Sequence, residues 1–199
     1  MTTMAVECAP EVRTTRSLLG YGVIAGPLYV TVSLAQLLTR DGFDPTRDAW
    51  STLASGRLGW IQMANLIVSG AMVVAAAVGA RRAIGRGWLG LAVYGAGMVV
   101  AGLFNADPSG STAVSWHGLV HFAAGGVGFV GLVVAGFRLA RVFGGWRSRA
   151  VAVFFAGMFV AMAASGGASW GIVGFSAAVI AASAWLSALS VHLYRTTDK

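Results

Sequence analysis

Two histidines and one aspartate carry the clearest potential for chemistry in this chain. His117 and His121 stand four residues apart in a long apolar stretch, and Asp107 precedes His117 by ten residues. Residues at positions i and i+4 project from the same face of a helix, so both imidazoles could reach one metal ion, proton or substrate group. Asp107, His117 and His121 are therefore the predicted catalytic residues.

These side chains also match the ligands of a zinc ion that keeps one coordination position open for water. Asp44, from a polar segment earlier in the chain, could add a carboxylate oxygen. The candidate metal ligands are thus Asp44, Asp107, His117 and His121. A zinc-bound water in such a site could cleave an amide or ester bond, which makes a metal-dependent, lipid-modifying hydrolase one interpretation.

Other interpretations remain open, so the sequence does not decide whether the protein is an enzyme. Asp107 could simply accept a hydrogen bond from His117 and hold a loop in place. The same groups could serve a proton-coupled transporter or a lipid-binding protein, because ionisable groups in membrane segments are costly to bury and are usually functional. The chain could also be a non-catalytic subunit that binds a membrane protein partner or forms a homo-oligomer.

The composition indicates that these residues sit in a membrane protein. The 199 residues are 57% hydrophobic and only 11% charged, which is too apolar for a water-soluble domain of this size. A helix of about 20 residues crosses a hydrocarbon core of about 30 Å. Six stretches approach or exceed that length, at residues 17–38, 59–80, 88–104, 116–137, 150–165 and 171–193.

Basic residues predict the orientation of these six spans. Of the 14 Lys and Arg residues, only Arg40, Arg47 and Arg57 fall on the side opposite the two termini. Arginine-rich short loops stay in the cytoplasm, so both tails, residues 1–16 and 194–199, should lie on the cytoplasmic side of the membrane. The net charge of +7 would then face anionic membrane lipids, and it requires no nucleic-acid partner.

Helix four of this arrangement should turn its histidines inward. His117, His121, Gly125 and Gly128 fall on one helical stripe, at offsets of 0, 4, 8 and 11 residues. Small residues mark places where membrane helices approach one another closely. The histidines are therefore expected to face a neighbouring helix rather than lipid.

The polar segments on the outer side should complete a pocket. Residues 39–58 contain too many apolar side chains for a disordered tether, so we expect a cap with a short helix at residues 48–53. Asp44 or Asp48 of the cap should turn toward the histidines, or toward Arg47 or Arg57. The predicted substrate-pocket residues are Trp60, Gln62, Asn65 and Trp116, although the amides could equally join helices by hydrogen bonds.

Several motifs of this chain resemble those of a family of bacterial six-helix membrane proteins known as domain of unknown function 998. They are Gly26-Pro27, Gly42-Phe43-Asp44, Ser51-Thr52-Leu53-Ala54, Gly59-Trp60-Ile61-Gln62, Asn65, Phe104-Asn105-Ala106-Asp107-Pro108, His117 and His121. The resemblance covers nearly the whole chain. It implies an all-α integral membrane protein, a bundle of six transmembrane helices with a structured outer loop after the first. It implies no reaction or cofactor, because that family has no generally established activity.

Overall fold

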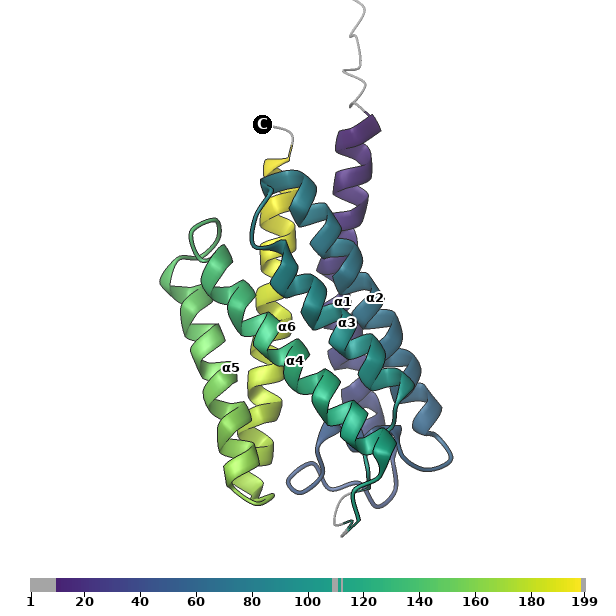
Figure 1. Ribbon diagram of the computed structural model, residues 1–199. Helices are drawn as coiled ribbons and strands as arrows, with labels where there is room; N and C mark the ends of the chain where they lie inside the picture. Colours follow the sequence, from purple (N-terminus) through teal and green to yellow (C-terminus); the bar gives the residue numbers. More distant parts are fainter. Residues whose placement is uncertain (1–9, 109–110, 112, 198–199) are drawn as a thin grey trace, which may run out of the picture.

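The computed structural model describes residues 10–108, 111 and 113–197. This part of the chain folds into six α-helices and one short 3-10 helix, η1, without strands (Figure 1). The elements are α1 (Pro10–Thr39), η1 (Trp50–Ala54), α2 (Gly59–Ile84), α3 (Trp88–Leu103), α4 (Trp116–Leu139), α5 (Trp146–Ala164) and α6 (Ser169–Thr196). The predicted all-helical architecture is confirmed.

The helices differ from the expected spans mainly at their ends. Helix α1 begins at Pro10 and α6 ends at Thr196, so both continue into the segments expected to be tails. Residues 1–9 and 198–199 of those tails lie outside the described residues. Five helices are long and apolar enough to cross a membrane, whereas α3 has only 16 residues.

Glycines end α2 and begin α3 within a three-residue turn. Gly85 and Gly87 adopt φ angles of 67° and 73°, a left-handed conformation that glycine reaches without steric cost. The Gly85 amide donates a hydrogen bond to the Arg81 carbonyl at 2.9 Å and closes the last turn of α2. The short turn makes α2 and α3 antiparallel neighbours.

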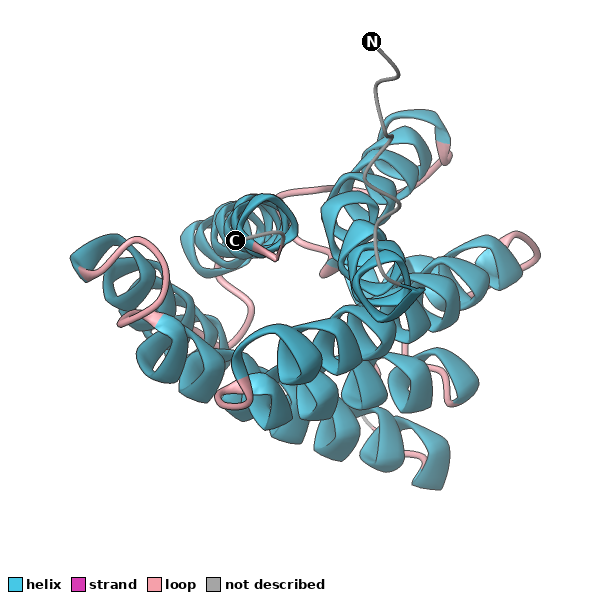
Figure 2. Ribbon diagram, turned by 90° about the horizontal axis from the view of Figure 1, so that it is seen from above, coloured by secondary structure: helices cyan, strands magenta, loops and turns pink. Residues whose placement is uncertain are grey.

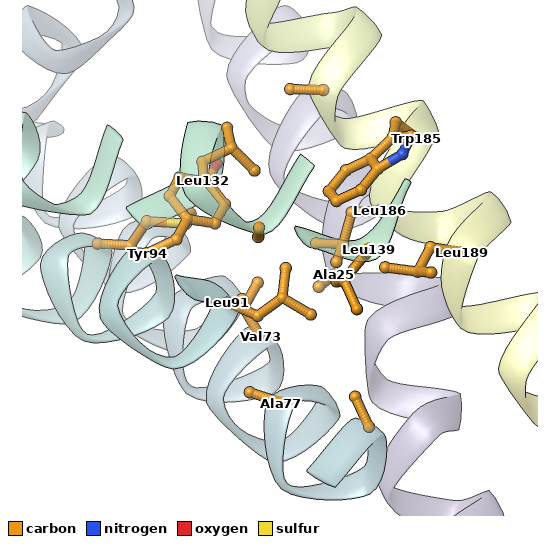
Figure 3. Close-up of a cluster of buried hydrophobic side chains, with 14 of the residues drawn as sticks. Ala25, Val73, Ala77, Leu91, Tyr94, Leu132, Leu139, Trp185, Leu186 and Leu189 are labelled. Carbon is orange, nitrogen blue, oxygen red and sulfur yellow. The ribbon is translucent and has the colours of Figure 1, made fainter. Parts of the chain in front are cut away.

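The six helices form a closed ring. Each helix packs against the next one along the chain, and α1 also packs against α6 (Figure 2). Large buried side chains such as Leu91, Leu139, Trp185 and Leu189 fill the interior of one part of this ring (Figure 3). The buried cluster draws on all six helices, so the ring is a single packed bundle.

Helices α3 and α4 touch through their backbones. A Cβ atom added at Gly90 would lie 2.5 Å from the Gly131 carbonyl oxygen, and one at Gly97 would lie 2.6 Å from the Ala124 carbonyl oxygen. Both distances are too short for any side chain, so glycine is required at these crossings. The close contact brings the C-terminal carbonyls of α3 beside the first turns of α4.

The segment after α1 folds over one end of the bundle, as predicted. Its helix, η1, begins two residues later than expected, and Trp50, Leu53 and Ala54 are buried. The Arg40 guanidinium fastens it, donating hydrogen bonds to the carbonyl oxygens of Leu53, Ser55 and Leu58 and to the Gln36 side chain. Residues 40–58 are therefore a structured cap, held from α1.

The start of α1, the end of α6 and the arginine-rich turns lie at the end of the bundle opposite this cap (Figure 1). Two arginines there lie over aromatic rings: Arg16 is 4.3 Å from the ring centre of Tyr194, and Arg81 is 5.1 Å from that of Trp88. Such contacts between cations and ring faces are typical of groups anchored at a membrane surface. The bundle thus has a cap end and an arginine end.

Candidate functional site

Asp107 lies just before α4 and holds the residue that begins this helix. Its Oδ1 accepts a hydrogen bond from the Ser115 hydroxyl at 2.5 Å, and its Oδ2 accepts one from the Ser115 amide at 3.0 Å. The Ser115 Oγ in turn accepts a bond from the Gly118 amide at 2.9 Å, as an N-cap residue does. The carboxylate therefore fixes the start of α4 through Ser115.

The first turn of α4 is shaped to admit this carboxylate. A Cβ atom at Gly118 would lie 2.2 Å from Oδ2 of Asp107, so only glycine leaves room for it. The hydrogen bonds from the Ser115 hydroxyl, and next from its amide, hold the pKa of Asp107 below the ordinary value of 3.8. The partial positive charge at the helix N-terminus acts in the same direction. Asp107 is thus held as an anion.

His117 joins the same network through Ser115. Its Nδ1 lies 3.0 Å from both the Ser115 Oγ and the Asn105 carbonyl oxygen. A carbonyl oxygen only accepts, so Nδ1 carries the proton and donates it. A direct hydrogen bond between Asp107 and His117 was one alternative that the sequence left open; the structure has a bridge through Ser115 instead. The Ser115 proton is directed at Asp107, so His117 does not act as a base toward that hydroxyl.

His121 occupies a different environment, one turn further along α4. It is only 6% exposed, and its Nδ1 lies 2.9 Å from the carbonyl oxygens of both Ala101 and Phe104. In the neutral imidazole, those two acceptors require the proton on Nδ1 and leave a lone pair on Nε2. Nε2 has no hydrogen-bond partner within the described residues, and it is not a completely buried atom. The histidine therefore faces α3, as its helical stripe predicted.

A cavity of about 140 Å³ lies beside His121 in the centre of the ring. Its wall is mostly apolar and includes residues from η1 and all six helices. Those that line it include Tyr29, Trp50, Leu66, Tyr94, Phe129, Phe159 and Phe175. The cap forms part of this wall through η1, so the cavity lies toward the cap end.

The predicted metal ligands do not converge. Asp44 Oδ1 accepts hydrogen bonds from the amide and hydroxyl of Thr46, at 2.8 and 2.7 Å, and so closes a local turn in the cap. The Asp44 amide donates a hydrogen bond to the Asp48 carboxylate at 2.9 Å. The hydrogen bonds from Thr46, and after them the charge of Arg47, hold the pKa of Asp44 below its ordinary value, so this carboxylate acts within the cap. Among the described residues, no group of three or more His, Cys, Asp or Glu side chains could hold a metal ion. The donor set therefore does not fit zinc.

The four predicted substrate-pocket residues lie elsewhere than in the cavity wall. Gln62 and Asn65 are buried between α1 and α2, where both bond to Ser33 and Asn65 also bonds to the Tyr29 carbonyl. These hydrogen bonds satisfy the amides within the helix pair, the alternative that the sequence left open. Trp60 and Trp116 are exposed on the outside of the bundle, as aromatic residues at a membrane interface are.

The aromatic part of the cavity was missing from the sequence interpretation. Phe129, Phe159 and Phe175 come from α4, α5 and α6, and their rings meet at centre distances of 5.0 to 5.8 Å. Gly125 falls on the stripe of His121, but a Cβ atom there would meet nothing within 4 Å, and only the structure shows that this glycine borders the cavity instead of a helix crossing.

Comparison with known proteins gives a family and no activity. The family model described as "Protein of unknown function (DUF998)" matches residues 23–192, which include most of every helix and all of the site. No curated protein and no solved structure matches the chain. The match confirms the resemblance drawn from the sequence motifs.

Proposed function

This chain belongs to the DUF998 family, and on that premise we propose that it is a multi-pass membrane protein that binds a lipid-like molecule in its central cavity. The observation that carries the proposal is the cavity itself. It has a mostly apolar wall built from every helix of the ring, and one of the few polar residues that line it is His121, whose Nε2 has no hydrogen-bond partner among the described residues. Ligand pockets typically combine an apolar lining with few, fixed polar groups.

The size of the cavity indicates how much of a ligand it encloses. A dry protein cavity of about 150 Å³ accommodates a molecule the size of benzene. The cavity of about 140 Å³ would therefore hold one ring or a short length of chain. The rest of a longer lipid must leave the enclosed space through an opening.

The packing of α4 and α5 supports an opening toward lipid. Near the arginine end the two helices are in contact, because a Cβ atom at Gly136 would lie 2.7 Å from the Cβ of Ala152. Toward the cap end they diverge (Figure 1), and Cβ atoms at Gly125 and Gly126 would meet nothing within 4 Å. Both glycines line the cavity. A chain could thus pass between α4 and α5 into the bilayer.

A metal-dependent hydrolase is the weaker candidate for this site. Each of His117 and His121 donates its Nδ1 proton to a backbone carbonyl and keeps Nε2 able to bind a metal, but no group of three or more His, Cys, Asp or Glu side chains in the described chain could hold one. A proton-coupled transporter would need further titratable groups along a path, whereas the cavity wall contains one histidine and no carboxylate. Binding of a lipid-like molecule requires neither a metal-binding group nor a path of titratable groups.

The charge distribution supports an orientation for this function. Arginine-rich turns at the end that carries both termini favour a cytoplasmic arginine end. The cap end, with the cavity beneath it, then faces the outside of the bacterial cytoplasmic membrane. The ligand would enter from the outer half of the bilayer.

Native mass spectrometry of the detergent-purified protein tests the proposal. Wild-type protein is expected to retain a lipid, and Gly125→Leu to lose it, because a leucine side chain of four carbons would fill most of the cavity. Gly157→Leu is the matched control: its Cβ also meets nothing within 4 Å, but it lies on the exposed face of α5 away from the cavity.

The two variants also separate binding from folding. Both leucines should be tolerated, since neither position requires a left-handed backbone or displaces a neighbour. Wild-type protein without bound lipid, or equal lipid retention in both variants, would contradict the proposal. Loss of lipid from Gly125→Leu alone supports it.

A further inference from the structure

His121 offers a ligand in the cavity a hydrogen-bond acceptor and no donor. The single proton of a neutral imidazole is committed at Nδ1, where two backbone carbonyls lie at 2.9 Å. A carbonyl oxygen accepts a hydrogen bond and cannot donate one, so moving the proton from Nδ1 to Nε2 would break both bonds. Nε2 therefore presents a lone pair to anything that reaches it.

The other polar groups of the wall do not choose between donors and acceptors. Ser51 and Tyr94 line the cavity, and their hydroxyl groups can rotate to donate or to accept. Ser176 and Tyr29 also line it, but Ser176 donates its proton to the Ile172 carbonyl at 3.0 Å. The Tyr29 hydroxyl is hydrogen-bonded with Ser33 and Gln62. A ligand with either kind of polar group could satisfy Ser51 and Tyr94. Selectivity must then come from His121, whose role is fixed by the backbone of α3.

The aromatic side of the cavity favours a ring. Phe129 meets Phe159 and Phe175 at interplanar angles of 75° and 65°, which leaves an array of ring edges and faces around the enclosed space. Aromatic rings prefer such edge-to-face contacts. The enclosed volume of about 140 Å³ matches one such ring.

We propose that the cavity recognises the hydroxyl-bearing, ring-sized head of a membrane amphiphile, such as a phenol, by a hydrogen bond from that hydroxyl to Nε2 of His121. This inference rests on the proposed function and specifies its ligand. An ether or ketone of the same size would set its lone pairs against that of Nε2 and leave the nitrogen without a partner. No proton transfer is required, because an O–H···N bond satisfies both groups.

Two fluorinated probes test the inference: a phenol, and its methyl ether, in which a methyl group replaces the hydroxyl proton. We would titrate 4-fluorophenol and 4-fluoroanisole into the full-length protein in detergent and follow 19F chemical shifts, with protein-free micelles subtracted. Dissociation constants are compared after correction for partition into the micelles. One neutral hydrogen bond is worth about 1 kcal/mol net, so the phenol should bind about five- to tenfold more tightly than the anisole.

The variant His121→Asn isolates Nε2. The asparagine amide nitrogen stands as many bonds from Cα as Nδ1 does, so it can still donate to the carbonyls of Ala101 and Phe104, whereas its Oδ1 takes the place of the ring carbon Cδ2 and ends one bond short of Nε2. This variant should fold, should bind both probes, and should lose the preference for the phenol. Gln62→Glu, outside the cavity wall, would disturb the bundle without this selective effect.

The outcomes distinguish this inference from the function beneath it. Saturable binding of both probes with equal affinity to wild-type protein would overturn the inference and leave the cavity as an apolar binding site. An unchanged phenol preference in His121→Asn would overturn it as well. If neither probe, nor the purely apolar 4-fluorotoluene, bound saturably, the proposed function would fall with it.

Discussion

The contact between Gly118 and Asp107 gives the most direct test of how the start of α4 is built. Replacing Gly118 by alanine adds one carbon 2.2 Å from Oδ2 and 2.6 Å from Cγ of Asp107. Ordinary van der Waals contact begins at 3.4 Å, so the carboxylate must retreat by about 1 Å. A shift of that size stretches its bonds from Ser115 toward or beyond the range of about 2.7–3.2 Å that hydrogen bonds favour.

Two opposing contributions set the size of the effect. Alanine favours a helix over glycine by about 1 kcal/mol, and less in the first turn. Forcing a carbon into an occupied space costs about 1–3 kcal/mol. Gly157→Ala gains the first contribution without the second, since its Cβ meets nothing within 4 Å. If the clash costs about 2 kcal/mol, Gly118→Ala should melt roughly 4–8 °C below Gly157→Ala.

The assay is thermal unfolding in one detergent, extended to a double-mutant cycle. In the Asp107→Ala background the clashing carboxylate is absent, so Gly118→Ala should no longer lower the melting temperature. A Gly118→Ala protein that melts at or above wild type would refute the reasoning. So would an equal loss in both backgrounds, because the loss would then not come from Asp107.

Three further predictions follow from the described contacts. Arg40→Met should accelerate hydrogen exchange across residues 49–55, because it removes the bonds that fasten the cap, whereas the exposed Arg57→Met should not. Because the folded protein lowers the pKa of Asp107, the ionised carboxylate stabilises the fold above about pH 4, and this stabilisation is lost as the pH falls through the lowered pKa. The melting temperatures of wild type and Asp107→Asn should therefore converge below pH 4. A constant difference from pH 7 to pH 3 would show that the ionised carboxylate is not the source of the stability difference. Cysteines introduced at residues 46 and 86 should react with impermeant reagents from the outside and the inside of cells, respectively, and the reverse pattern would invert the proposed orientation.

The elements of this fold could be predicted because each depends on local sequence. Apolar runs between short polar turns define the helices, and a glycine on each side of Arg86 ends one helix and starts the next. A local pattern, the stripe of small residues on α4, also predicted that His121 faces a neighbouring helix. These features need no knowledge of which other helix packs nearby.

The site could be predicted only in part, because its contacts cross between segments. Donor chemistry and spacing suggested that His117 and His121 bind one ligand. In the structure their Nδ1 atoms bond to different carbonyls, that of Asn105 in the loop after α3 and that of Ala101 within α3. Ser115 was overlooked as the residue between Asp107 and His117, although an N-cap serine is a local signal. The cavity arises from the spacing of all six helices and is encoded in no single motif.

The shortness of α3 has a consequence for the bilayer around the protein. Its 16 residues rise about 24 Å, roughly 6 Å less than a typical hydrocarbon core. Hydrophobic mismatch of this kind is relieved when lipid thins locally or when polar backbone is set below the membrane surface. Beyond the end of α3, Ser115 donates hydrogen bonds to Asp107, and His117 bonds to the Asn105 carbonyl, so these polar groups have partners within the protein at such a depth. A dimple in the leaflet at the cap end would bring lipid headgroups to the level of His121.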